Sequence, residues 1–170
     1  MNVELVMPCK KYWESYKASF DEMDHTGLVD GMHWDGKSEP EDYFERAREL
    51  AEGRNLGHLV PATNFWIIAE GAYVGRMSIR HELNDWLRNY GGHIGYEVKT
   101  SARRKGIATR ALELAIHFCS ESLDLHELML TCDDDNLASI KTIEKNGGEL
   151  IEKREDEANN RLSRYYKIRC

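Results

Sequence analysis

A run of three cations and a glycine stands where the sequence predicts the start of a helix. The run is Arg103-Arg104-Lys105-Gly106-Ile107-Ala108-Thr109, and it follows a strand-like segment, 93–98, that ends in Val98. Beyond it, apolar residues recur at helical spacing: Ala108, Ala111, Leu112, Ala115, Phe118 and Cys119. The start of a helix offers free backbone N–H groups and positive potential, and a glycine lets a phosphate approach the backbone. The pattern therefore predicts an anion site, against the alternative of a solvated basic turn.

The elements that must position this run predict one α+β domain, residues 1–170, with a mixed, mostly antiparallel sheet flanked by helices. Helices are expected at 9–23, from about Pro40 to Gly53, after Gly106, and from Asn136 to Asn146. The segments 24–39 and 81–91 are expected to be connections. Strands are expected at 3–7, 64–69, 73–80, 93–98, 127–131, 150–154 and 161–168.

Between a strand and a helix, Arg103-x-x-Gly106-x-Ala108 resembles the acetyl-CoA signature of the GNAT superfamily of N-acetyltransferases, Q/R-x-x-G-x-G/A. The order of predicted elements is also similar to the GNAT order over nearly the whole chain. The resemblance implies a GNAT-like fold, acetyl-CoA as cosubstrate, and transfer of acetyl to a primary amine in a ternary complex. It implies that loop amides hold the CoA pyrophosphate and that the preceding strand splays to admit the pantetheine arm. Val98 and the residues from Arg103 to Thr109 would then contact CoA.

A second segment is similar to the GNAT pattern N-x-x-A-x-x-L-Y-x-K-x-G-F. Asn136, Lys145 and Gly147 fit this pattern, and Ser139 stands where a small residue is usual. The resemblance implies that Asn136 bonds the pantetheine arm from the start of this helix, with Ser139 also at the site. A simple N-cap role explains Asn136 equally well.

Two departures of this segment from the GNAT pattern bear on the chemistry. Ile143 replaces the tyrosine that usually protonates the departing thiolate, and Gly148 replaces the usual aromatic residue. A CoA thiol has a pKa near 8.5, so solvent could supply that proton. Three tyrosines remain as other donors: Tyr96, Tyr165 and Tyr166. Ile143 is also the feature that favours an alternative function, a non-catalytic acyl-CoA-binding or sensor module on the same fold.

The predicted chemistry also needs a base. An amine with a pKa of about 10.4 is nucleophilic in only about one molecule in 10³ at pH 7, a deficit worth roughly 4–5 kcal/mol. His93 and Glu97 flank Gly95 on one face of the expected strand, where GNAT enzymes often place a histidine or glutamate. His93 suits neutral pH best, because its ordinary pKa is near 6.5. Both residues stay candidates beside the alternative of ordinary strand residues, and His81 and Glu82 are weaker ones.

Composition limits the other function classes. The 170 residues include 41% hydrophobic and 31% charged residues, with a formal net charge of −7. This charge argues against a nucleic-acid partner and is compatible with a cationic, amine-bearing acceptor. No apolar run is long enough for a membrane partner, and the first residues do not resemble a signal peptide, so a cytoplasmic location is expected. The four cysteines lack C-x-x-C spacing, so we expect neither disulfides nor a metal site. A dimer is compatible with the sequence.

Two further features invite a functional interpretation. Residues 31–38 fit the phosphate-loop pattern G-x-x-x-x-G-K-[ST], but no apolar strand precedes them and Pro40 follows closely. The pattern therefore predicts no nucleotide site here. Trp86 and Tyr90 lie in the connection beside the proposed site, where they could line an acceptor pocket or pack as ordinary aromatic residues.

Overall fold

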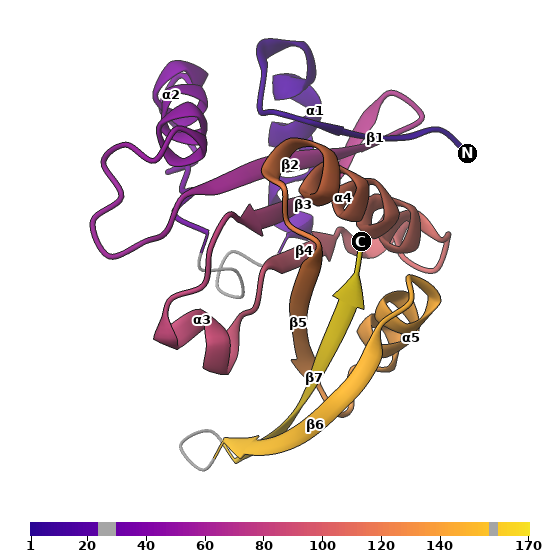
Figure 1. Cartoon of the computed structure of the whole chain (residues 1–170). Coiled ribbons are helices and arrows are strands. Elements are labelled where there is room, and N and C mark those ends of the chain that lie inside the picture. The colour runs from indigo at the N-terminus through magenta and orange to yellow at the C-terminus, as the bar shows by residue number, and fades with distance from the viewer. Residues whose placement is uncertain (24–29, 157–159) are drawn as a thin grey trace.

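The computed structural model describes residues 1–23, 30–156 and 160–170, which form an α+β domain built on two antiparallel sheets (Figure 1). The first sheet has the strand order β1-β2-β3-β4, and the second has the order β5-β7-β6. This confirms the predicted fold class, with every pairing inside the two sheets antiparallel. The strands are β1 (Val3–Val6), β2 (Ala62–Ala69), β3 (Ala72–Arg80), β4 (Ile94–Val98), β5 (Glu127–Asp133), β6 (Glu149–Asp156) and β7 (Arg161–Arg169).

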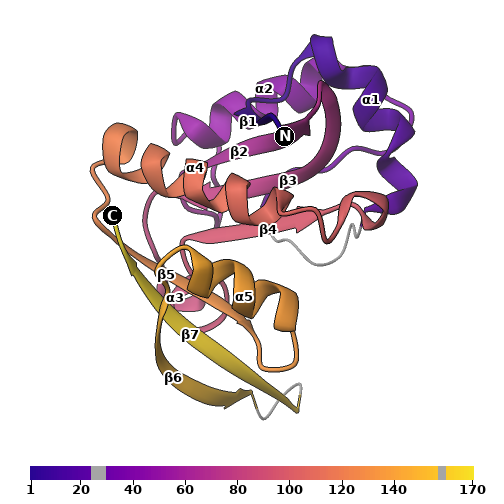
Figure 2. The same cartoon turned by 90° about the vertical axis from the view of Figure 1, so that its right-hand side faces the viewer.

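Helices pack on both faces of the first sheet (Figure 2). On one face, α4 (Ile107–Leu123) buries Ala111, Leu112 and Ala115 against apolar residues of β2, β3 and β4. On the other face, aromatic residues of α1 (Trp13–Ala18) and α2 (Pro40–Ala51) pack around Trp66 and Tyr73. The aromatic cluster therefore covers part of this second face of the sheet. Polar residues of β3 and β4, among them Arg76, Ser78, Arg80 and Glu97, lie on the same face.

Two helical predictions need correction. The helix expected at 9–23 is three short pieces: a 3-10 turn at Lys10–Tyr12, α1, and a second 3-10 turn at Phe20–Glu22. The break falls at Ser19, where ψ is 0°. The expected connection 81–91 contains a helix, α3 (Asp85–Tyr90), whose first turn is capped by the Asn84 side chain accepting from the Leu87 N–H at 2.9 Å. Six residues are too few to show a helical period, so only the cap signals this helix in sequence.

The other expected connection, 24–39, is only partly described. Residues 24–29 lie outside the described residues, and 30–39 form no helix or strand. A third 3-10 turn, Thr100–Ala102, links β4 to the run before α4, and α5 (Leu137–Lys145) follows β5. Residues 157–159, between β6 and β7, also lie outside the described residues.

The two sheets meet at one point and then separate. Gly92 forms a bridge with Leu130, and the His93 N–H donates to the Met129 carbonyl at 2.7 Å. A Cβ at residue 92 would lie 2.4 Å from that carbonyl oxygen, so the approach requires glycine. Beyond this point β4 pairs with β3 while β5 pairs with β7, and the two strands diverge (Figure 2).

Candidate active site

The separation of the sheets exposes one edge of β4. In the antiparallel ladder with β3, the pairs Ser78–Gly95 and Arg76–Glu97 share hydrogen bonds, because the flanking bonds Arg80 N–H to His93 and Lys99 N–H to Val74 fix the alternation. The backbone groups of the alternate residues, including Tyr96 and Val98, therefore face away from β3. No strand of the described chain pairs with this side of β4 beyond the Gly92 bridge. The result is a sheet edge open to a ligand with amide groups.

The basic run lies at the end of this edge. Gly106 is the N-cap of α4 with φ +78°, and a Cβ there would meet nothing within 4 Å. Its left-handed backbone and open surroundings leave the N–H groups of the first turn of α4 accessible. Arg104, also at positive φ (+61°), is exposed together with Lys105. Lys105 Nζ also donates to the Ser101 carbonyl at 3.2 Å, so Arg104 and the helix start are the groups most open to an anion.

Arg103 has a different place from its neighbours. Its Nε atom donates to the carbonyl of Val98 at 2.8 Å, so the side chain folds back onto the end of β4. This bond closes the turn between strand and helix and satisfies the last carbonyl of the open edge. Ile107 is buried in the main core, while Ala108 and Thr109 are partly buried at the start of α4.

The second predicted segment lies on α5, beside β5. Asn136 is the N-cap of this helix, and its Oδ1 accepts from the Ser139 N–H at 3.1 Å, so the capping role occurs as expected. The Asn136 amide nitrogen is not used in that bond, and the residue is exposed. At the other end of α5, Asn146 Nδ2 donates to the carbonyls of Thr109 (3.2 Å) and Thr142 (2.9 Å). Asn146 thus joins the end of α5 to the first turn of α4.

The two departures from the GNAT pattern are in contact. Ile143 is fully buried, and a Cβ added to Gly148 would lie 2.4 Å from its Cγ2 atom and 2.9 Å from its carbonyl oxygen. A side chain at 148 is therefore excluded by the isoleucine and by the close backbone. The two replaced positions of the pattern are therefore direct neighbours in this structure.

Of the three tyrosines that remain as proton donors, two have other partners. The Tyr165 hydroxyl donates to the Asn89 carbonyl, and the Tyr166 hydroxyl donates to Glu144 Oε1 at 3.0 Å. Tyr96 lies on the open strand, and its buried hydroxyl is near Ser139 and Thr142 of α5 but makes no hydrogen bond of good geometry among the described residues. Burial raises the pKa of Tyr96 to about 12, while Ser139 and Thr142 on α5 act in the opposite direction.

His93, expected within the strand, directly precedes β4, whereas Glu97 lies within it, and the two side chains have separate surroundings. The Nδ1 atom of His93 accepts from the Met129 N–H at 2.9 Å. Burial is the largest effect and lowers the pKa of the ring, with Arg80 and Arg88 acting in the same direction and the backbone of Met129 opposing them. Glu97 instead lies against Arg76, with 3.4 Å between Oε2 and Nε. Four residues of strand separate the two side chains, which is about 13 Å along the sheet. The structure does not bring them together as a pair.

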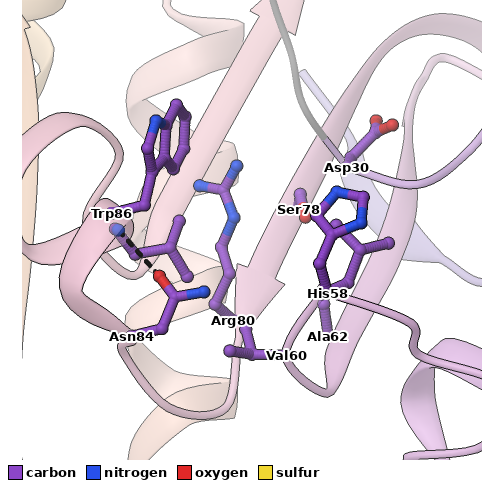
Figure 3. A pocket seen from close by; sticks show the side chains of 10 residues that line it. Asp30, His58, Val60, Ala62, Ser78, Arg80, Asn84 and Trp86 are labelled. Atoms are coloured by element: carbon purple, nitrogen blue, oxygen red, sulfur yellow. Dashed lines mark hydrogen bonds between the residues drawn. The ribbon is translucent and has the colours of Figure 1, made fainter.

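Sequence reasoning missed a cavity of about 470 Å³ on the same face of the sheet (Figure 3). Ser78 and Arg80 of β3 form its floor, Trp86 and Leu87 of α3 form one wall, and Asp30 lies opposite. Trp86 lines this cavity, whereas Tyr90 is not among the lining residues. The alternation of Arg76, Ser78 and Arg80 with Met77 and Ile79 was the sequence signal for this polar face.

The phosphate-loop-like segment uses two of its amides to bind its own carboxylate. The carboxylate of Asp35 accepts from the N–H groups of Lys37 (2.8 Å) and Ser38 (2.7 Å) and from the Ser38 hydroxyl (2.8 Å). These bonds lower the pKa of Asp35 to about 2. An internal carboxylate therefore takes the position that a phosphate would need.

Within the described ranges, no group of three or more histidine, cysteine or acidic side chains could hold a metal ion. No helix in those ranges is long and apolar enough to span a membrane. The four cysteines are free thiols.

Comparison with known proteins identifies the family. Among solved structures, the microcin C7 self-immunity acetyltransferase MccE, in complex with acetyl-CoA and AMP, matches with a TM-score of 0.68 at 18% identity, over 99% of this chain and 92% of that one. RimL, a ribosomal L7/L12 α-N-protein acetyltransferase in complex with coenzyme A, matches with a TM-score of 0.64 at 16% identity, over 99% and 94%.

The ribosomal-protein-S5-alanine acetyltransferase from Vibrio fischeri matches with a TM-score of 0.64 at 18% identity, over 98% of this chain and 91% of that chain. At these identities the likeness shows a shared fold. No curated protein sequence gives a significant match. The family model of the acetyltransferase (GNAT) domain matches residues 21–149. The chain therefore belongs to the GNAT family of acetyltransferases, acyltransferases that use acetyl-CoA.

Proposed function

We propose that the chain, as one domain over residues 1–170, transfers acetyl from acetyl-CoA to a primary amine by direct attack in a ternary complex. The observation that carries this proposal is the open edge of β4, which leads to the exposed start of α4. The pantetheine arm of CoA contains two amides and can pair with such an edge as an added strand would. Its pyrophosphate then reaches the free N–H groups and cations at the helix start.

The residues of the loop divide the cosubstrate contacts between them. We assign the pyrophosphate to the backbone from Arg104 to Thr109, including Gly106, Ile107 and Ala108, and to the side chains of Arg104 and Lys105. Arg103 fixes the loop through its bond to Val98, and adds positive charge. Asn136 and Ser139 approach the arm from the opposite wall, with the free amide nitrogen of Asn136 as a donor.

Direct transfer is favoured over an acetylated-enzyme intermediate by the state of the thiols. Cys132 lies on β5, and burial raises the pKa of its thiol to about 11, while burial raises that of Cys119 to about 12. A cysteine with such a pKa is almost entirely a thiol at neutral pH, and the thiolate is the nucleophile. The amine therefore attacks the thioester carbon itself, and its surplus proton leaves to a base while the thioester sulfur departs.

The geometry favours Glu97 over His93 as the proton acceptor. The bond from Met129 occupies Nδ1 of His93, so the neutral ring carries its hydrogen on Nε2 and has no free lone pair. Glu97 has carboxylate lone pairs in addition to its contact with Arg76, and it faces the same side of β4 as the cavity floor. We assign proton acceptance to Glu97, directly or through one water, and assign to His93 the task of fixing the mouth of the cleft.

Tyr96 is the residue that we assign to the departing thiolate. A phenol with a pKa of about 12 does not transfer its proton to a thiolate whose conjugate acid has a pKa near 8.5. It can donate a hydrogen bond, and the proton that completes the CoA thiol comes from solvent or from the base.

The proposal is tested by thiol release from acetyl-CoA across a panel of primary amines, with mass spectrometry of the products. We expect thiol release that depends on the amine and an N-acetylated product. Double-reciprocal plots of the initial rate should give intersecting lines, as a ternary complex requires. The intact mass of the protein should be unchanged after incubation with acetyl-CoA alone. Binding of acetyl-CoA without amine-dependent turnover would instead support an acyl-CoA-binding module.

A further inference from the structure

Arg80 is a buried cation with an incomplete set of partners. Only 5% of the residue is exposed, and its Nη1 atom has no hydrogen-bond partner among the described residues. Burying a guanidinium without satisfying its donors is costly, and such groups are normally paired. Burial also lowers the pKa of Arg80, which reflects the same cost. The side chain extends into the 470 Å³ cavity between Trp86 and Ser78 (Figure 3).

The carboxylate in the cavity does not complete Arg80. Asp30 lies across the cavity from the guanidinium (Figure 3), and its Oδ1 accepts from the Met32 N–H at 2.9 Å. Its Oδ2 lies 3.6 Å from Nη1 of Arg76, the arginine that also contacts Glu97. Among the described residues, the carboxylates of Asp30 and Glu97 both lie against Arg76, and Arg80 receives only the long-range attraction of Asp30.

The walls around Arg80 restrict what can neutralise it. Trp86, Leu87, Val60 and Ala62 present apolar surface, and the Asn84 oxygen is already used as the cap of α3. Trp86 is 49% exposed, so it marks the entrance of the cavity. A small anion attached to an apolar or planar body fits a pocket with apolar walls and a cation at its floor.

We propose that this cavity binds the acceptor, and that Arg80 receives an anionic group, a carboxylate or a phosphate, carried by the acceptor in addition to its amine. This inference rests on the proposed amine acetylation and names the class of its substrate. Arg80 is two residues from Ser78, about 7 Å along β3, and Ser78 pairs with Gly95 of β4. Because Gly95 has no side chain, the amine end of such an acceptor can extend across β4 toward the open edge.

The test compares acceptors that differ only in the anionic group. One arm uses an α-amino acid and its amide, and a second uses an aminoalkyl phosphate and the uncharged amino alcohol. We expect the wild-type kcat/KM to favour the anionic member of at least one pair by about 10- to 150-fold, the range of a charged hydrogen bond. The arm that shows the preference distinguishes carboxylate from phosphate.

Arg80→Met supplies the variant, because it keeps the length and apolar stem of the side chain. It should abolish the preference while leaving acetyl-CoA affinity and the cooperative thermal unfolding in place. Arg48→Met is the matched control, since Arg48 is exposed on α2 with 55% of its side chain accessible. Equal rates for both members of each pair in the wild type would overturn the inference, as would a preference that survives Arg80→Met; neither result affects the proposed acetyl transfer.

If no amine in either arm is acetylated, the proposed function fails and the anion site is tested directly. Calorimetry then measures binding of inorganic phosphate and of benzoate to the wild type and to Arg80→Met. Binding that the variant loses supports the site without the enzyme assay. Absence of binding to the wild type would overturn it.

Discussion

The Nδ1 atom of His93 accepts a hydrogen bond from the Met129 N–H at 2.9 Å, one residue past the point where the two sheets meet. The backbone of His93 bonds to Met129 as well, through its own N–H at 2.7 Å. The histidine therefore holds β4 to β5 twice, immediately before they separate. Protonating the ring would place an N–H against the N–H of Met129, so this contact belongs to the neutral form.

Stability should depend on pH through His93. Burial lowers the pKa of the folded His93 ring, so below pH about 6.5 the unfolded chain binds a proton that the folded chain resists. The free energy of unfolding should therefore fall as the pH drops from 6.5 toward the lower folded pKa, and be fully recovered above 6.5. Urea unfolding at several pH values should show a shallower dependence for His93→Gln than for the wild type. His126→Gln, at an exposed position, should match the wild type; an unchanged slope in His93→Gln would contradict this reading.

Turnover should distinguish the two candidate bases. Glu97→Gln removes the proton acceptor and should lower kcat by about 10²–10⁴, with acetyl-CoA affinity unchanged. His93→Gln, whose amide oxygen can accept from Met129, should have a much smaller effect. The measurement is the pH–rate profile of each variant with one good amine, and Glu113→Gln on the exposed side of α4 is the control. The reverse order of effects would assign the base to His93.

The two arginines of the loop should respond differently to charge reversal. Arg104→Glu should weaken CoA binding by several kcal/mol with little change in stability, since a charged hydrogen bond contributes about 1.5–3 kcal/mol and the residue is exposed. Arg103→Glu should weaken binding and also cost about 1 kcal/mol of unfolding free energy, because the bond to Val98 is lost. Calorimetry and urea unfolding measure the two effects. Lys10→Glu, remote on an exposed turn, should change neither.

Substitutions at Gly106 should act through the backbone conformation of this residue and not through contacts with neighbouring protein atoms. A side chain there meets open space, but φ is +78°, so Gly106→Val should cost about 1–2 kcal/mol of folding free energy and obstruct the phosphates. Gly106→Asn should cost less, because asparagine tolerates this conformation. CoA affinity by calorimetry and helix content by circular dichroism test both variants. Full CoA affinity in the valine variant would remove the anion site from this loop.

Tyr96→Phe should separate catalysis from stability. Removing a buried hydroxyl that makes no hydrogen bond of good geometry with the described residues should leave the unfolding free energy unchanged or raise it by about 1 kcal/mol. If the hydroxyl binds the departing thiolate, kcat should fall by about 10- to 150-fold, the equivalent of 1.5–3 kcal/mol. Tyr90→Phe on the exposed end of α3 provides the control. A stable Tyr96→Phe enzyme with full kcat would exclude this role.

The predictable features of the molecule are those that interactions between residues close in sequence determine. The turn at Gly106 and the cap at Asn136 follow from local chemistry. The break at Ser19 and the short helix α3 were missed because short segments show no periodicity.

The cavity around Arg80 depends on contacts between distant parts of the chain. Asp30, Ser78 and Trp86 come from three separate segments, and their meeting follows from tertiary packing that a single sequence does not display. The same is true of the bond between His93 and Met129, 36 residues apart. The residue type alone makes His93 a candidate base. The fold shows that its Nδ1 already accepts a hydrogen bond from Met129.

The open edge of β4 makes the stability of the folded chain depend on the concentration of its cosubstrate. An unpaired strand edge is a place where other chains can add, and proteins normally cover it. If CoA occupies this edge as we propose, the ligand is also the cover, and it stabilises the folded chain by about 2.7 kcal/mol at a concentration 100 times its Kd. A fall in the acetyl-CoA concentration would then lower the stability of the folded protein as well as its turnover. The amount of enzyme in the cell would in that case depend on the acetyl-CoA concentration.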